Sequence, residues 1–181
     1  MKKLFFVPAL AGALYLAACG GGQSNSGTET ATETTAPSTG AADQAVATVP
    51  GIDTVALSNT IELEGNDQMK FNKTLFKVKA GEAVKLNFKN VGSLPKEAMG
   101  HNVVVLLPGT DLASFGGEAV RAQAEDYIPA TFASSIVAHT KLLGPGENDS
   151  VEFTLNDKGV YPFVCSFPGH YGIMQGNIVA E

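Results

Sequence analysis

Short segments that alternate apolar and polar residues recur along much of this chain, and turn-forming residues separate them. In one segment Val84, Leu86 and Phe88 share a face, because the side chains of a strand point alternately to its two sides. Further strand candidates lie at residues 75–80, 101–107, 135–143, 151–155, 161–166 and 175–180. Many short strands with turn signals between them predict an all-β fold, an antiparallel β-sandwich.

One segment departs from this pattern. Residues 113–126 are rich in Ala, Glu, Gln and Arg and predict a short helical insertion. Residues 51–181 together have the length of one domain and can bury a core of their own. We therefore expect a single β-sandwich domain that carries one short helix.

The N-terminus has the features of a secretory signal. Lys2 and Lys3 precede an apolar run, residues 4–18, which is short for a membrane span and ends in small residues. The run ends in Leu16-Ala-Ala-Cys19, which resembles the lipobox of bacterial lipoproteins. That resemblance implies a signal peptide at residues 1–18 and an acylated Cys19. The alternative is an ordinary signal peptide next to which Cys19 is incidental.

The residues after Cys19 predict a tether. The stretch 20–40 has no aromatic or large aliphatic side chain and cannot bury a core. We therefore expect residues 19–50 to join the domain flexibly to a lipid anchor. The expected location is the surface of a bacterial membrane, the outer one where there are two, with the domain facing the periplasm or the cell exterior.

The charge of the chain excludes one class of partner. Twelve Lys and Arg residues face eighteen Asp and Glu residues, which gives a formal net charge of −6 at pH 7. Removal of Lys2 and Lys3 with the signal peptide makes this value more negative. Nucleic-acid binding needs clustered basic residues, so we expect no nucleic-acid partner.

The most informative motif is Cys165-Ser-Phe-Pro-Gly-His170-Tyr-Gly-Ile-Met174. It places a thiol, an imidazole and a thioether on one loop that Pro168 and Gly169 force to turn. A site of one Cys, two His and a weakly bound Met is the ligand set of a blue-copper electron-transfer centre. A disulfide between Cys165 and Cys19 is the alternative reading of the two cysteines.

The burial expected for Cys165 also favours a metal. Tyr161, Phe163 and Cys165 lie on one face of a predicted strand, so Cys165 points to the core if Phe163 does. A buried thiolate without a partner is costly, and a bound cation offsets that cost. Of the two remaining histidines, His101 opens a strand at a pole of the sandwich, whereas His139 has polar and charged neighbours typical of a surface residue.

Three segments resemble the signature segments of the azurin family. They are residues 94–102 (Leu-Pro-Lys-Glu-Ala-Met-Gly-His-Asn), residues 138–147 (Ala-His-Thr-Lys-Leu-Leu-Gly-Pro-Gly-Glu) and the loop from Cys165 to Met174. Residues 64–72 also resemble an azurin N-terminal strand, so the likeness covers nearly all of the chain from about residue 60 onward. The resemblance implies a Greek-key, cupredoxin-like β-sandwich.

The resemblance also implies the copper ligands. His101, Cys165 and His170 match the three strong ligands of one type 1 copper, and Met174 matches the long axial sulfur. The backbone carbonyl of Gly100 matches the opposite axial position.

Two further groups of residues follow from the same resemblance. Asn102 and the amide of Phe167 match positions that tie the ligand loops together and donate to the Cys sulfur. Leu94, Met99, Pro168 and Gly169 match the apolar docking patch around His170, the expected electron port.

These features predict an extracytoplasmic one-electron carrier that cycles Cu(II) and Cu(I) between membrane-associated redox proteins, not an enzyme. A copper storage or delivery module with the same ligands is the alternative. A Cys–His nucleophile pair is disfavoured, because the sequence offers no obvious oxyanion loop and acyl transfer has no use for the Met. Zinc also accepts His and Cys ligands, and we expect it only as a contaminant.

Overall fold

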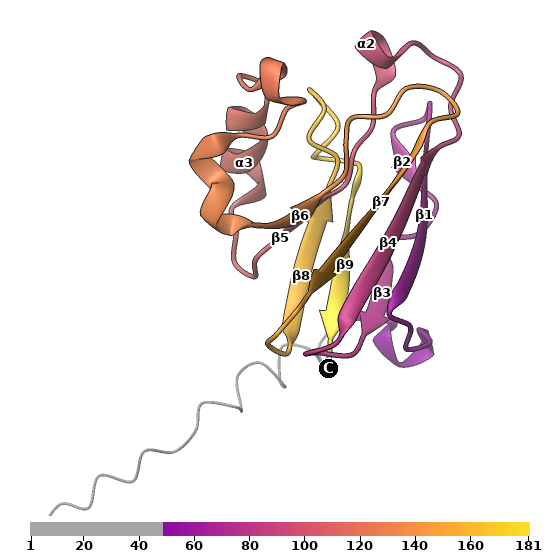
Figure 1. The fold of residues 1–181 in the computed structure, drawn as a ribbon, viewed down its shortest axis with the longest axis vertical. Helices are drawn as coiled ribbons and strands as arrows, with labels where there is room; N and C mark the ends of the chain where they lie inside the picture. Colours follow the sequence, from indigo (N-terminus) through magenta and orange to yellow (C-terminus); the bar gives the residue numbers. More distant parts are fainter. Residues whose placement is uncertain (1–48) are drawn as a thin grey trace, which may run out of the picture. The chain divides into compact units, whose positions relative to one another are not determined.

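A computed structural model describes residues 49–181 of the chain, and two β-sheets stack in it as a sandwich (Figure 1). One sheet has four strands in the order β2-β1-β4-β7, and the other has five in the order β3-β9-β8-β5-β6. The strands are β1 Thr60–Asn66, β2 Lys70–Phe71, β3 Leu75–Val78, β4 Ala83–Asn90, β5 Val104–Leu106, β6 Ile136–His139, β7 Asn148–Thr154, β8 Gly159–Val164 and β9 Gln175–Ala180. The predicted cupredoxin-like β-sandwich is confirmed.

The sheets are mixed, so the expectation of an antiparallel sandwich is wrong in this detail. Strand β1 pairs with β4 in parallel, and β3 pairs with β9 in parallel, whereas the other strand pairs are antiparallel. Alternation of apolar residues identifies the buried face of a strand and carries no information on the direction of its neighbour. The pattern therefore predicted the strands and not how they pair.

The core lies between the two sheets. In β4 the side chains of Val84, Leu86 and Phe88 are almost fully buried, as the alternation predicts. Phe71, from the four-stranded sheet, packs edge-on against Phe88 and reaches across to Phe163 on β8, with ring centroids 5.9 Å and 5.4 Å away. Such aromatic contacts join the two sheets and fix the end of β8 that leads into the Cys165 loop.

The helical insertion is confirmed in type and shorter than predicted. Helix α3 spans Leu112–Ala119, and the rest of the predicted segment forms a turn followed by the 3-10 helix η2 at Gln123–Glu125. The Asp111 carboxylate caps α3 by accepting a 2.7 Å hydrogen bond from the Ser114 N–H. The other helical elements are η1 Ile52–Thr54, α2 Lys96–Met99 and η3 Ala130–Ser135.

The predicted strands at residues 101–107 and 135–143 are much shorter in the structure. Strand β5 begins at Val104, and β6 ends at His139. His101 instead forms an isolated bridge with Leu143, in which each backbone N–H donates to the other residue's carbonyl at 3.1 Å and 2.7 Å. This bridge fixes the backbone of His101 directly before β5.

The predicted signal peptide, Cys19 and nearly all of the predicted tether lie outside the described residues. The first described residue, Val49, packs with Val55 around Ile52 and Val179. None of the helices in residues 49–181 has the length and apolar character to span a membrane.

Candidate metal centre

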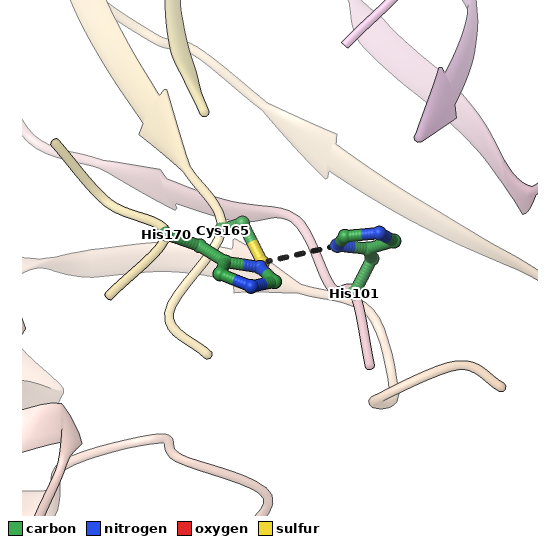
Figure 2. A group of neighbouring side chains, drawn as sticks. All are labelled: His101, Cys165 and His170. Carbon is green, nitrogen blue, oxygen red and sulfur yellow. Dashed lines mark hydrogen bonds between the residues drawn. The ribbon is translucent and has the colours of Figure 1, made fainter. Parts of the chain in front are cut away.

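Strand β8 ends at one end of the sandwich (Figure 1). Three buried side chains meet beside this end of the strand. The donor atoms of His101, Cys165 and His170 all lie within 4.8 Å of one another. Their side chains converge from two separate parts of the chain (Figure 2). His101 and Cys165 are 0% exposed and His170 is 3% exposed, so the cluster is almost closed to solvent.

The spacing of these donors fits a shared metal ion. Metal bonds of about 2.3 Å to sulfur and about 2.0 Å to imidazole, at an angle of about 120°, put the sulfur about 3.7 Å from each nitrogen. The Cys165 Sγ lies 3.9 Å from Nδ1 of His101 and 3.6 Å from Nδ1 of His170. Both nitrogens therefore face the sulfur at the separation that a common ion requires.

Met174 supplies a fourth donor beside this cluster. Its side chain is fully buried, and its methyl carbon would lie 2.7 Å from a Cβ added to Gly65. The same added atom would lie 3.4 Å from the His101 ring, so the side chains of Met174 and His101 both lie next to Gly65. A thiol, two imidazoles and a thioether gathered in this way match the donor set of a blue-copper centre.

Backbone hydrogen bonds hold the ligand loop in shape. The N–H of Cys165 donates to the carbonyl of Met174 at 2.9 Å, and the N–H of Met174 donates to the carbonyl of His170 at 2.8 Å. The loop turns at Gly169, whose φ of 82° lies in the left-handed region that glycine adopts without strain. These bonds fix the three ligands relative to one another before any metal binds.

Asn102 joins the two parts of the chain that carry the ligands. Its side-chain Nδ2 donates to the Ser166 hydroxyl at 2.7 Å, and its Oδ1 accepts from the Ser166 N–H at 2.8 Å. Asn102 follows His101 and Ser166 follows Cys165, so this pair fixes the separation of two ligands. Ser166 escaped the sequence analysis, because its role depends on a contact with a residue far away in the chain.

Burial dominates the electrostatics of the cluster. It raises the pKa of the Cys165 thiol to about 11, although the backbone N–H groups of Asn102 and Phe167 donate to the sulfur and lower the pKa. Burial, followed by the neighbouring His101, lowers the pKa of His170 to about 4. Burial also lowers the pKa of His101, although the Asn66 backbone and the Asp67 charge raise it. Without a metal, both imidazoles are therefore neutral at pH 7 and the thiol keeps its proton.

The residues predicted for the docking patch reach the surface in part. Leu94 is 43% exposed and Gly169 is exposed, whereas Met99 and Pro168 are half-buried. Ile173 also reaches the surface, with 59% exposure, and the sequence analysis missed it. An apolar residue between two candidate ligands, in a loop of turn residues, was the signal that could have identified it.

The structure also describes the surroundings of two other residues considered in the sequence analysis, Gly100 and His139. Gly100 is buried, and a Cβ there would lie 2.7 Å from the carbonyl of Lys96, so only glycine fits. His139 is exposed on β6 and lies outside the cluster, as its polar neighbours indicated.

The loop that carries Leu94 is held by a carboxylate that the sequence analysis did not identify. Asp67 accepts hydrogen bonds from the N–H and the hydroxyl of Ser93, both at 2.8 Å, and from the Leu94 N–H at 3.3 Å. These bonds lower the pKa of Asp67, the Ser93 N–H most strongly. The turn between β1 and β2 thereby fixes the segment that leads to α2 and His101.

Comparisons with known proteins agree with this geometry. A family model described as copper binding proteins, plastocyanin/azurin family, matches residues 57–181. The azurin of Alcaligenes faecalis is 41% identical over 122 residues, which cover 65% of this chain and 94% of that protein. The azurin of Pseudomonas aeruginosa strain PAO1 is 36% identical over 132 residues, which cover 70% and 88%.

Solved structures show the same fold. A sodium-dithionite-reduced auracyanin from the photosynthetic bacterium Roseiflexus castenholzii matches with a TM-score of 0.63 and 33% identity, over 70% of this chain and 99% of that one. An azurin from the obligate methylotroph Methylomonas sp. strain J matches with a TM-score of 0.61 and 28% identity, over 67% and 97%.

A cupredoxin-like sandwich that holds a buried His-Cys-His-Met cluster defines an azurin-like blue copper protein. The chain belongs to the plastocyanin/azurin family of copper binding proteins. His101, Cys165, His170 and Met174 form its type 1 copper site. The expectation that the chain is not an enzyme agrees with its membership of this family.

Proposed function

We propose that this protein is an extracytoplasmic one-electron carrier that serves redox proteins at a bacterial membrane. The observation that carries the proposal is the buried Cys165–His101–His170 cluster, with Met174 beside it. Copper bound there supplies the one-electron couple between Cu(II) and Cu(I). The chain holds its soft and nitrogen donors in one frame that suits both states, so little has to rearrange when an electron moves.

Burial favours this function over copper storage or delivery. A delivery site must expose its ligands so that an acceptor can compete for the metal. Here His101, Cys165 and Met174 are fully buried and His170 is only 3% exposed. The Asn102–Ser166 pair also ties the two ligand segments together. Such a site retains its metal while it exchanges electrons.

His170 is the electron port that we propose. Its ring lies on the loop at the end of the sandwich and packs against Phe167, with ring centroids 4.8 Å apart. Leu94, Met99, Pro168 and Gly169 supply apolar surface to the proposed docking patch. A small apolar patch suits brief encounters with redox partners, which bury little area.

Three other assignments belong to the same proposal. The Gly100 carbonyl would offer the metal an oxygen donor, and the N–H groups of Asn102 and Phe167 would tune the Cys165 sulfur. Residues 1–18 are the signal peptide, and residues 19–50 tether the copper domain to a lipid on Cys19. The anchor keeps the carrier close to membrane partners and leaves the domain free to turn toward each of them.

The copper test uses absorption and redox titration. Cu(II) added to the metal-free protein is expected to give an intense blue thiolate-to-copper band, and Cys165→Ser is expected to abolish it. His139→Gln is the matched control, because His139 lies outside the cluster, and it should keep the band. The band should disappear on reduction and return on oxidation without loss of metal. A colourless copper-loaded protein, or prompt transfer of copper to a chelating acceptor, contradicts the proposal.

The anchor is tested separately in cells. The full chain is expected in the membrane fraction with an acyl group on Cys19, and Cys19→Ser is expected in the soluble exported fraction. A wild-type chain that is soluble and unacylated would remove the anchor from the proposal and leave the copper site unaffected.

A further inference from the structure

A strained turn lies beside the copper site. Asp126 and Tyr127 have φ values of 52° and 64°, and of the residues that the structure describes only Met69 is a third non-glycine residue with positive φ. The left-handed region costs a side chain of this size about 1 kcal/mol or more, and most of all a bulky residue such as Tyr127. Two consecutive residues of this kind persist only where surrounding contacts hold them.

Each of the two residues contacts a different part of the copper site. The backbone carbonyl of Asp126 accepts a hydrogen bond from Nδ2 of Asn102 at 3.3 Å. The ring of Tyr127 packs edge-on against Phe167, with centroids 5.2 Å apart and an interplanar angle of 69°. The N–H of Tyr127 donates to the carbonyl of Ala122 at 2.8 Å, which closes the turn.

Asn102 and Phe167 are the two residues whose backbone N–H groups lower the pKa of the Cys165 thiol, so both groups face its sulfur. They come from segments far apart in the sequence, one after His101 and the other within the ligand loop. The two residues of the turn at 126–127 thus contact the side chains of Asn102 and Phe167. Relaxation of both residues to an ordinary backbone would move the carbonyl and the ring together.

We propose that Asp126 and Tyr127 are positioning residues whose left-handed turn fixes the two N–H groups that face the Cys165 sulfur. The consequence for copper rests on the proposed function, whereas the positioning itself does not. Donation to the sulfur draws negative charge from it, and a sulfur with less negative charge favours the reduced metal. Weaker donation is therefore expected to lower the reduction potential.

The test compares four variants with the wild type. Tyr127→Gly removes the ring and relieves the strain, and Tyr127→Leu keeps apolar bulk without the ring. Tyr127→Phe keeps the ring and is the conservative control. Asp126→Gly keeps the carbonyl and relieves the strain, so it controls for strain alone.

Two readouts separate positioning from a loss of stability. The first is hydrogen exchange of the Phe167 amide in the metal-free protein, with the amides of β4 as the internal reference for global stability. The second is the reduction potential of the copper-loaded protein, with the energy of its thiolate-to-copper band. Tyr127→Gly is expected to speed Phe167 exchange about tenfold relative to β4 and to lower the potential. Tyr127→Phe and Asp126→Gly are expected to leave both readouts unchanged.

Either ring-deletion variant can overturn the proposal. If folded Tyr127→Gly or Tyr127→Leu keeps the wild-type exchange rate and potential, the turn does not position the donors. If Tyr127→Gly does not fold, the exchange rate and potential of Tyr127→Leu decide whether the turn positions the donors. If the wild type binds no blue copper but Phe167 exchange still changes in the ring-deletion variants, the proposed function fails and the positioning stands.

Discussion

Single residues set the chemistry of the copper site through their burial. The pKa of His170 falls to about 4 and that of His101 also falls, while the pKa of Cys165 rises to about 11. At neutral pH the metal-free cluster therefore carries no charge, and both imidazoles offer a free lone pair. Only Cys165 has to lose a proton before it can bind a metal.

This arrangement predicts a pH dependence of copper binding. Between about pH 7 and pH 9 we expect one proton to be released for each copper bound, because the thiol is protonated and both imidazoles are neutral. Affinity should therefore rise about tenfold for each unit of pH in this range. Calorimetric titration in buffers of different ionisation enthalpy measures the proton count. A count near zero would mean that Cys165 is already a thiolate in the metal-free protein.

Gly65 leaves the room that Met174 occupies. A Cβ at this position would lie 2.7 Å from the Met174 methyl carbon and 3.1 Å from the Phe88 ring. We expect Gly65→Ala to cost about 1–3 kcal/mol of unfolding free energy and to shift the blue band, since Met174 must move. Gly172→Ala is the control, because a Cβ there meets nothing within 4 Å. Equal unfolding midpoints and spectra for the two variants would contradict this role.

At the scale of elements, the sequence predicted the features that depend on a regular repeat or on residues close together in the chain. Alternation located the buried face of β4, and the fixed spacing of Cys165, His170 and Met174 predicted the ligand loop. The left-handed turn at residues 126–127 could not be predicted, because no glycine marks it and long-range contacts hold it. The ends of β5 and β6 were missed for a related reason, since His101 makes a bridge rather than part of a strand.

Helix α3 packs against the ligand loop where Gly116 lies next to the ring of Tyr171. A Cβ on Gly116 would run into the ring of Tyr171, the residue that follows His170, whereas a Cβ on Gly117 meets nothing within 4 Å. Gly117→Ala should therefore stabilise the protein by about 0.5–1 kcal/mol, because alanine favours a helix. Gly116→Ala should instead destabilise it by about 1–3 kcal/mol and alter the blue band. Denaturant unfolding and absorption of both variants measure this, and equal effects would contradict the coupling.

At the scale of the whole molecule, the sandwich brings together ligands that lie far apart in the chain. His101 precedes β5, whereas the other three ligands follow β8. Strand alternation predicted two stacked layers, and the resemblance to azurins predicted that His101 meets the loop. Only the structure revealed the parallel pairs β1–β4 and β3–β9. Alternation of apolar and polar residues is the same in parallel and antiparallel strands, so the sequence pattern does not reveal strand direction.

Bound copper is expected to stabilise the whole domain. All four ligands lie in the folded core, so copper binds the native state and shifts the unfolding equilibrium toward it. Free copper at one hundred times its dissociation constant adds about 2.7 kcal/mol, or roughly 10 °C in the midpoint of thermal unfolding. Calorimetry with and without copper measures the shift. Cys165→Ser should lose most of it, and an equal shift in that variant would place copper elsewhere.

Strand β9 is the last element of the chain, yet it lies between β3 and β8 inside the five-stranded sheet. That sheet therefore stays incomplete until β9 has been synthesised. Pairing of β9 with β3 also joins segments about a hundred residues apart, and such long-range contacts slow folding. A nascent chain that lacks β9 leaves β3 and one edge of β8 without their partner strand in this sheet.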